Sequence, residues 1–144
     1  MNRRPADNPV AATVSALLIP FMQIYSLYLI AHGDLGPGGG FQGGAIFAAS
    51  LILRAVVFGL DREEERRLDT IAGSLAAAGV LVYGGIGLLC MLRGGAFLEY
   101  PALPFADPKT AYHLGIYGIE IGVGLAVAGA MLMLFMKTAG SRDD

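Results

Sequence analysis

Charged side chains are scarce in this chain of 144 residues. They make up 15% of the sequence, whereas a typical soluble domain has roughly 25%. Hydrophobic residues make up 55%, and so few charges cannot cover that much apolar surface in water. The composition also excludes a disordered chain, and the net charge of −2 excludes a basic nucleic-acid-binding protein. We therefore expect the chain to lie in a lipid bilayer and to bind no nucleic acid.

The residue types on which many reactive sites depend are also rare. Cys90 is the single cysteine, which excludes a disulfide scaffold and a CxxC motif. The two histidines, His32 and His113, do not make a metal site by themselves. No nucleophile stands beside a candidate base, and no pair of carboxylates lies within an apolar stretch. We therefore predict no catalytic residues, no metal and no cofactor, and a protein that is not an enzyme.

Four stretches carry almost no charge, and each is long enough to cross a bilayer as a helix, which takes roughly 20 apolar residues. They are residues 10–31, 41–60, 70–92 and 113–136. None has the polar–apolar alternation of a membrane barrel. We predict an all-α membrane protein, a single domain over residues 1–144 with four transmembrane helices. The first helix should be kinked at Pro20, because proline cannot donate a hydrogen bond to the carbonyl of Ala16.

The basic residues predict the orientation of these spans. With four spans, both termini and the middle loop lie on one side, which holds Arg3, Arg4, Arg62, Arg66, Arg67, Lys137 and Arg142. The other side holds only Arg93 and Lys109 outside the spans, so the positive-inside rule places both termini in the cytoplasm. We expect residues 61–69 to form a solvated cytoplasmic turn. We expect residues 93–112 to form an ordered outer loop at the membrane interface.

Small residues recur every four positions on two of the predicted helices. The second carries Gly40, Gly44 and Ala48, and the fourth carries Gly118, Gly122 and Ala126 as helix-packing residues. Such spacing lets helix backbones approach closely, which matters in lipid because apolar burial gives little drive for association there. Two interpretations stay open: the small residues pack the four helices against one another, or they dock onto partner proteins.

The connection between the first two spans is the most unusual segment. Its signature residues are Pro37, Gly38, Gly39, Gly40, Phe41, Gly43 and Gly44. The glycine spacing formally matches a dinucleotide-binding fingerprint, but that motif requires a strand before it, whereas a membrane span stands there. The glycines instead predict a tightly folded start of the second helix. Free amides at this helix start could attract an anion or a carboxylate.

Glu120 is a carboxyl inside the last predicted span, where such a group is costly and marks a candidate functional site. A helix places His113, Tyr117 and Glu120 on one face, nearly opposite to Gly118 and Gly122. We treat His113, Tyr117 and Glu120 as ion-path candidates. The alternative is a structural hydrogen bond from Glu120 to a neighbouring helix.

Other polar residues also lie within the spans. Arg54 in the second span either extends to the lipid headgroups or forms an intramembrane ion pair with an acidic group on a partner helix. Glu120 is not expected to be that acid, because it lies near the opposite face of the membrane. Gln23, Tyr25, Ser26 and Tyr28 make the outer half of the first span polar, which is consistent with hydrogen bonds between helices.

The run from His32 to Gly44, H-G-D-L-G-P-G-G-G-F-Q-G-G, resembles the signature of the B subunit of Mrp-type multisubunit Na⁺/H⁺ antiporters. That family has G-H-x-x-P-G-G-G-F followed by x-G-G between its first two spans. Here the opening departs from that pattern, because Ala31 precedes the histidine and four residues instead of two separate His32 from Pro37, whereas residues 37–41 and 43–44 match. The resemblance also covers the length, the charged middle turn and the proline-rich outer loop, and therefore nearly the whole chain.

The resemblance implies an accessory subunit of a complex in a bacterial or archaeal cell membrane. Such a complex exchanges cytoplasmic Na⁺ for external H⁺, and its partners are other membrane subunits, the lipid bilayer and the two ions. Large subunits hold most of the proton-path residues, and small ones chiefly help to assemble the ion route. Three alternatives stay open: an equivalent subunit of a membrane-bound hydrogenase or related respiratory complex, a purely structural scaffold, and a self-sufficient small channel or carrier.

Overall fold

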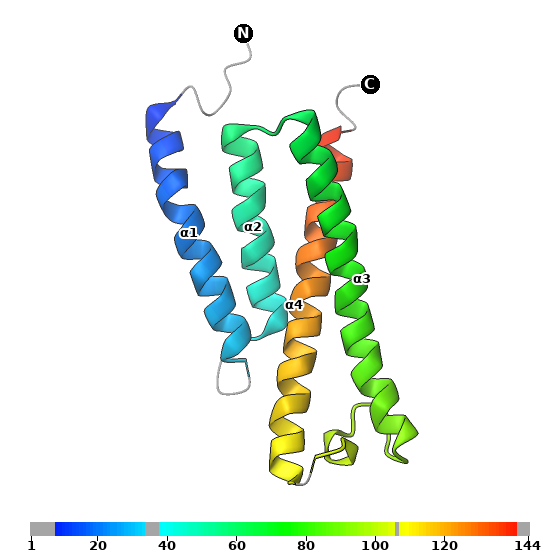
Figure 1. Cartoon of the computed structure of the whole chain (residues 1–144). Coiled ribbons are helices and arrows are strands. Elements are labelled where there is room, and N and C mark those ends of the chain that lie inside the picture. Colours follow the sequence, from blue (N-terminus) through cyan, green and yellow to red (C-terminus); the bar gives the residue numbers. More distant parts are fainter. Residues whose placement is uncertain (1–7, 34–37, 106, 141–144) are drawn as a thin grey trace.

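The computed structural model describes residues 8–33, 38–105 and 107–140. This part of the chain folds into four long helices, α1 (Pro9–Ala31), α2 (Gly40–Phe58), α3 (Arg62–Leu92) and α4 (Pro108–Gly140), and a short 3₁₀ helix, η2 (Tyr100–Ala102) (Figure 1). All four long helices have the length and the apolar composition needed to cross a membrane. The predicted all-α fold with four membrane-length helices is confirmed.

The helices form a row rather than a bundle closed around a central core. α1 packs on α2, α2 packs on α4, and α4 packs on α3, with only a slight contact between α1 and α4. Figure 1 shows α4 between α2 and α3, although α2 and α3 are consecutive in the chain. One end of the helices, at the top in Figure 1, holds the start of α1, the α2–α3 connection and the end of α4. We call it the charged end. α1 and α3 are therefore edge helices, each with one side open to lipid or protein.

The charged run at residues 61–69 was predicted to be a turn, and that prediction is wrong. Asp61 caps α3, which begins at Arg62 and contains the rest of the run. The Glu64 amide donates to the Asp61 carboxylate over 2.7 Å, and the Asp61 amide donates to the Glu64 carboxylate over 3.3 Å. This reciprocal capping box satisfies amides that the first helical turn would otherwise leave free. The helix therefore starts before the apolar stretch does.

The outer loop is also shorter than predicted, because α4 begins at Pro108 rather than near residue 113. Asp107 caps the helix: its carboxylate accepts from the Thr110 amide at 3.1 Å and from the Thr110 hydroxyl at 3.0 Å. Those hydrogen bonds lower the pKa of the Asp107 carboxyl. An acidic cap followed by proline at the first helical position is a strong start signal.

The shortened loop packs onto the ends of α3 and α4 that lie opposite the charged end. Phe97 contacts Gly87 of α3, and Tyr100 contacts Gly115 of α4. Cys90, Leu103 and Ala111 form a small buried cluster with Tyr100 packed against it, and burial raises the pKa of the Tyr100 phenol. α3, the loop and α4 therefore form one packed unit, which extends beyond the end of α1 and the start of α2 (Figure 1).

The rest of the core is built mostly from alanines. Ala48, Ala72, Ala128 and Leu132 form a buried cluster where α2, α3 and α4 meet. Large apolar side chains elsewhere point outward; Leu17 and Phe21 of α1 are each 63% exposed. Exposing so many large apolar side chains is unfavourable in water and is expected in lipid. The sizes of the core residues therefore set the helix spacing, while the outer surface is left to lipid or protein.

Candidate functional site

Glu120 of α4 lies against the start of α2. Its Oε2 accepts a hydrogen bond from the backbone N–H of Gly40, the first residue of α2. This N–H is one of those that a helix leaves without an intrahelical partner, and the positive end of the helix dipole favours a carboxylate there. The sequence indicated a carboxylate-attracting helix start and a carboxyl within a span as separate features. The structure brings the two together.

Glycines enclose this carboxylate. A β-carbon on Gly39 would lie 2.7 Å from Oε2 of Glu120, and one on Gly33 would lie 2.9 Å from its Cδ. On Gly40, a β-carbon would lie 2.9 Å from the amide nitrogen of Gly124 and would collide with the backbone carbonyl of Glu120. Gly39 has φ = +125°, in the region that favours glycine. The start of α2 is therefore shaped around Glu120.

The same segment fits α2 between α1 and α4. A β-carbon on Gly44 would lie 3.0 Å from Cα of Gly124, and one on Gly43 would lie 2.7 Å from the carbonyl oxygen of Ser26 in α1. Gly38 contacts Leu29, whose carbonyl accepts a 3.2 Å hydrogen bond from the Gly39 amide. These glycines thus bring three helix backbones together.

Phe41, the remaining described residue of the signature, does not take part in these contacts. Phe41 points outward and is 65% exposed. Pro37 lies outside the described residues. The glycines of the described signature thus allow close backbone contact, whereas the ring of Phe41 faces away from the neighbouring helices.

Tyr117 holds the other side of the α1–α2 turn. Its hydroxyl donates to the backbone carbonyl of Ala31, the last residue of α1. Tyr117 therefore ties α4 to the end of α1, and Glu120 ties it to the start of α2. His113 is exposed one turn further along, with its ring centroid 6.3 Å from that of Tyr112. Of the three ion-path candidates, Tyr117 and Glu120 therefore contact the adjoining ends of α1 and α2.

The opposite face of α4 packs on α3. A β-carbon on Gly122 would lie 3.1 Å from the carbonyl oxygen of Gly79, and Gly79 in turn abuts Ala126. Gly118 contacts Ile86 of α3. Packing within the chain therefore accounts for the stripe formed by Gly118, Gly122 and Ala126. No heavy atom of the described neighbours lies within 4 Å of a β-carbon built on Gly84 or Gly85.

Arg54 forms an ion pair within its own chain. Its Nη2 lies 3.0 Å from Oε1 of Glu64, and the two side chains are 48% and 42% exposed. A second pair, Lys137 with Asp69 at 3.7 Å, joins α4 to α3 at the same end. Exposed pairs of this kind contribute about 0–1 kcal/mol. We therefore regard both pairs as setting the relative positions of helix ends more than as stabilising the fold.

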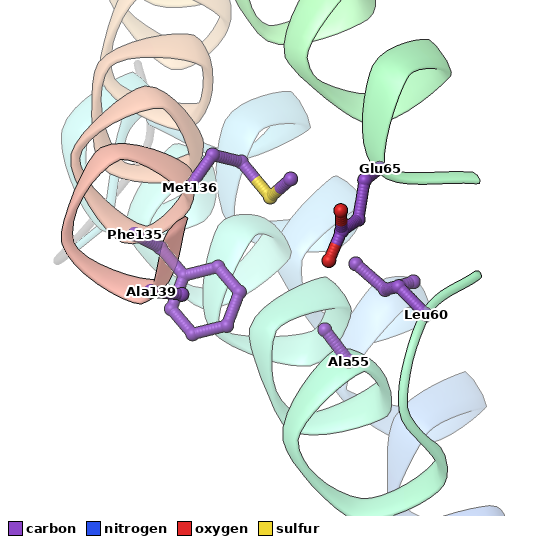
Figure 2. A pocket seen from close by; sticks show the side chains of 6 residues that line it. All are labelled: Ala55, Leu60, Glu65, Phe135, Met136 and Ala139. Atoms are coloured by element: carbon purple, nitrogen blue, oxygen red, sulfur yellow. The ribbon is translucent and has the colours of Figure 1, made fainter. Parts of the chain in front are cut away.

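A hollow of about 160 Å³ lies beside these pairs at the charged end. It is lined by residues of α2, α3, α4 and the α2–α3 connection: Ala55, Leu60, Glu65, Phe135, Met136 and Ala139. Figure 2 shows the carboxylate of Glu65 pointing into it, opposite the thioether of Met136. Glu65 is not among the site residues predicted from the sequence, because the charged run was expected to form a turn. The capping box would have placed Glu65 on a helix.

The fold is that of a multi-pass membrane protein, with four membrane-length helices in a row and a carboxylate that joins α4 to the start of α2. Its described residues include no group of three or more histidine, cysteine or acidic side chains that could hold a metal ion. A family described as a domain related to the MnhB subunit of Na⁺/H⁺ antiporters matches residues 10–133, and the chain belongs to this family. The resemblance inferred from the glycine-rich signature is thereby confirmed.

Relatives of nearly the same length bear matching names. The chain is 26% identical over 136 residues to the B subunit of a Na⁺/H⁺ antiporter from Bacillus subtilis, and the match covers 88% of this chain and 94% of the relative. It is 24% identical over 143 residues to a putative antiporter subunit of Staphylococcus haemolyticus, covering 95% and 98%. A Staphylococcus aureus relative of the same description is 27% identical over 139 residues, covering 95% and 98%.

Proposed function

We propose that this chain is an accessory membrane subunit of a multisubunit Na⁺/H⁺ antiporter in a bacterial or archaeal cell membrane. It helps to assemble the route by which Na⁺ leaves the cell and H⁺ enters. The observation that carries the proposal is the family match over residues 10–133, which reaches all four long helices. The relatives are named as antiporter subunits, which favours an antiporter over a hydrogenase or another redox-driven complex.

In this proposal the charged end of the helices faces the cytoplasm. Arg62, Arg66, Arg67 and Lys137 belong to helix segments at that end, whereas Arg93 and Lys109 belong to the loop side. The positive-inside rule then places both termini in the cytoplasm. Glu120, three turns into α4 from Pro108, lies toward the outer side. Pro20 is the point at which we expect α1 to bend, because the Ala16 carbonyl has no amide donor there.

Glu120 has two roles in this proposal. As a carboxylate it holds the start of α2, and as an ionisable group at the junction of three helices it forms part of the ion route with Tyr117 and His113. Its hydrogen bond with Gly40 and the contacts of Gly33 and Gly39 support the first role. The rarity of carboxyls within membrane spans supports the second. A structural role alone predicts that charge at this position is dispensable.

The test is to delete the gene for this chain alone from a cell that carries the complete complex. Everted membrane vesicles should lose Na⁺-dependent proton movement, measured with a ΔpH-sensitive dye, and re-expression of the chain should restore it. The purified chain in liposomes should give no such movement by itself. Unchanged exchange in the deletion strain, or exchange by the chain alone, would contradict the proposal.

A further inference from the structure

We propose that the open face of α1 around Pro20 binds a transmembrane helix of another subunit, through hydrogen bonds to the Gln23 carboxamide and the Ala16 carbonyl. The identity of the partner as a subunit of the same complex rests on the proposed function. The face itself is separate from the Glu120 site, which lies on the side of α1 that packs against α2 and α4.

α1 is an edge helix, and only one of its sides is covered. Ser15, Ser26 and Leu29 are its buried residues and face α2. Ala16, Pro20 and Leu27 lie at spacings of four and seven residues, so they share a different face. All three are exposed, Leu27 to 58%. Gln23 lies at the margin of this face and is half-buried.

This open face carries a carboxamide that has no hydrogen-bond partner in the described chain and a carbonyl that lacks its usual helical donor. The Gln23 carboxamide offers two N–H donors and an acceptor oxygen, and its side chain makes no hydrogen bond to any described residue. Pro20 has no N–H, so the Ala16 carbonyl lacks its helical donor. Gln23 lies about 12 Å along the helix from Ala31, well inside a span of membrane length. Lipid tails cannot satisfy either group there.

A helix of another subunit meets these requirements better than lipid does. Small side chains at Ala16 and Pro20 let a second backbone approach, and two polar side chains on that helix, each a Ser, Thr, Asn or Gln, could pair one with the carboxamide and one with the freed carbonyl. The Ala16 carbonyl, which is an acceptor, and the Gln23 carboxamide, which is a donor and an acceptor, lie about 10 Å apart along the helix axis. A single partner helix running beside α1 can reach both.

The first test is photo-crosslinking in the intact complex. The photoreactive residue p-benzoylphenylalanine replaces Ala16, and the matched control places it at Val14, which is 49% exposed and lies on nearly the opposite side of α1. We expect position 16 to crosslink to one transmembrane segment of a co-purifying subunit, identified by mass spectrometry, at least fivefold more than position 14. Equal yields from both positions, lipid adducts alone, or adducts to a second copy of this chain would overturn the proposal.

The second test removes the hydrogen bonds. Gln23→Leu should lower the share of this chain recovered with its partners about threefold, which is the effect of one average hydrogen bond between membrane helices. Tyr25→Phe is the control, because it removes a polar group at a similar depth on another side of α1. Equal recovery of the Gln23→Leu variant and the wild type, at equal membrane abundance, would contradict the role of Gln23.

The two proposals fail in different ways. If the wild-type complex neither assembles around this chain nor exchanges ions, the proposed function fails. If it assembles and exchanges ions while position 16 gives no subunit crosslink, only the α1 interface fails.

Discussion

The close contact between α2 and α4 makes Gly40→Ala the most informative single substitution. The added β-carbon would meet backbone on two sides: the amide nitrogen of Gly124 at 2.9 Å and the backbone of Glu120 at still shorter range. Backbone cannot move aside as a flexible side chain can. The start of α2 must therefore shift away from α4, which also lengthens the hydrogen bond between Gly40 and Glu120.

The expected loss of stability follows from these two effects. Overpacking of a tight contact costs about 1–3 kcal/mol, and a weakened hydrogen bond to a charged group adds up to about 1.5–3 kcal/mol. Alanine recovers at most about 1 kcal/mol of helix propensity. We expect a net loss of about 1–3 kcal/mol at the α2–α4 contact, which corresponds to a roughly 5- to 150-fold rise in its opening.

Thiol labelling measures this opening at two places in one chain. Ala48 of α2 is fully buried in a cluster with Ala128 of α4, so Ala48→Cys introduces a protected thiol at the α2–α4 contact, while the native Cys90 is equally buried at the α3–α4 end. Labelling rates of both sites in the membrane complex can be read by mass spectrometry. Gly40→Ala should accelerate labelling at position 48 by the same roughly 5- to 150-fold and leave Cys90 nearly unchanged, because Cys90 is buried with Leu103 and Ala111 in a separate cluster between α3, the loop and α4.

Gly85→Ala is the matched control, because no described heavy atom lies within 4 Å of its added β-carbon. It should leave both labelling rates within about twofold, since an unhindered glycine-to-alanine change in a helix is neutral or mildly stabilising. If Gly40→Ala and Gly85→Ala behave alike, the reasoning from backbone contact is refuted. Equal acceleration at both thiols would instead show that the row unfolds as one unit.

Three further predictions concern the helix ends. Arg54→Met should change stability by no more than about 1 kcal/mol, because the pair with Glu64 is exposed; a larger loss of complex in thermal denaturation would mean that the pair is desolvated by a partner. The pKa of Asp107 is lower in the folded chain than its ordinary value of 3.8, so its cap stabilises the start of α4 above that value. This stabilisation is lost as the pH falls through the lower folded pKa. Hydrogen exchange of the first turn of α4 should show the loss, and Asp107→Asn should remove the pH dependence. Phe97→Ala should expose Cys90 to thiol reagents more than Phe105→Ala does, because Phe97 packs on Gly87 of α3; equal labelling of the two variants would contradict that role.

The four helices could be predicted from the sequence because apolar length is a strong signal, but their ends could not be set by hydropathy alone. α3 and α4 both start before their apolar stretches, at acidic caps on Asp61 and Asp107. A helix cap depends on local hydrogen bonds from one side chain, and hydropathy does not report these bonds. The pattern Asp61-x-x-Glu64 and the Asp107–Pro108 pair were the signals that could have placed these ends.

The order of the helices and the partner of Glu120 needed the structure. α4 carries glycines on two faces, with Gly122 toward α3 and Gly124 toward α2, and this is why it lies between helices that are neighbours in the chain. The sequence indicated the stripe of Gly118, Gly122 and Ala126 but not the helix that this stripe contacts. Pairing Glu120 with Gly40 joins residues 80 positions apart, and no local pattern specifies a contact over that distance.

The Na⁺/H⁺ exchange activity of the assembled complex with Glu120→Gln and Glu120→Ala tests the central claim most directly. The carboxamide oxygen of the Gln variant can still accept from the Gly40 amide, so this variant should assemble normally while exchange in everted vesicles falls at least tenfold. The Ala variant lacks the acceptor and should lose assembly as well. Wild-type exchange by a fully assembled Glu120→Gln complex would contradict the claim and leave Glu120 with a structural role alone.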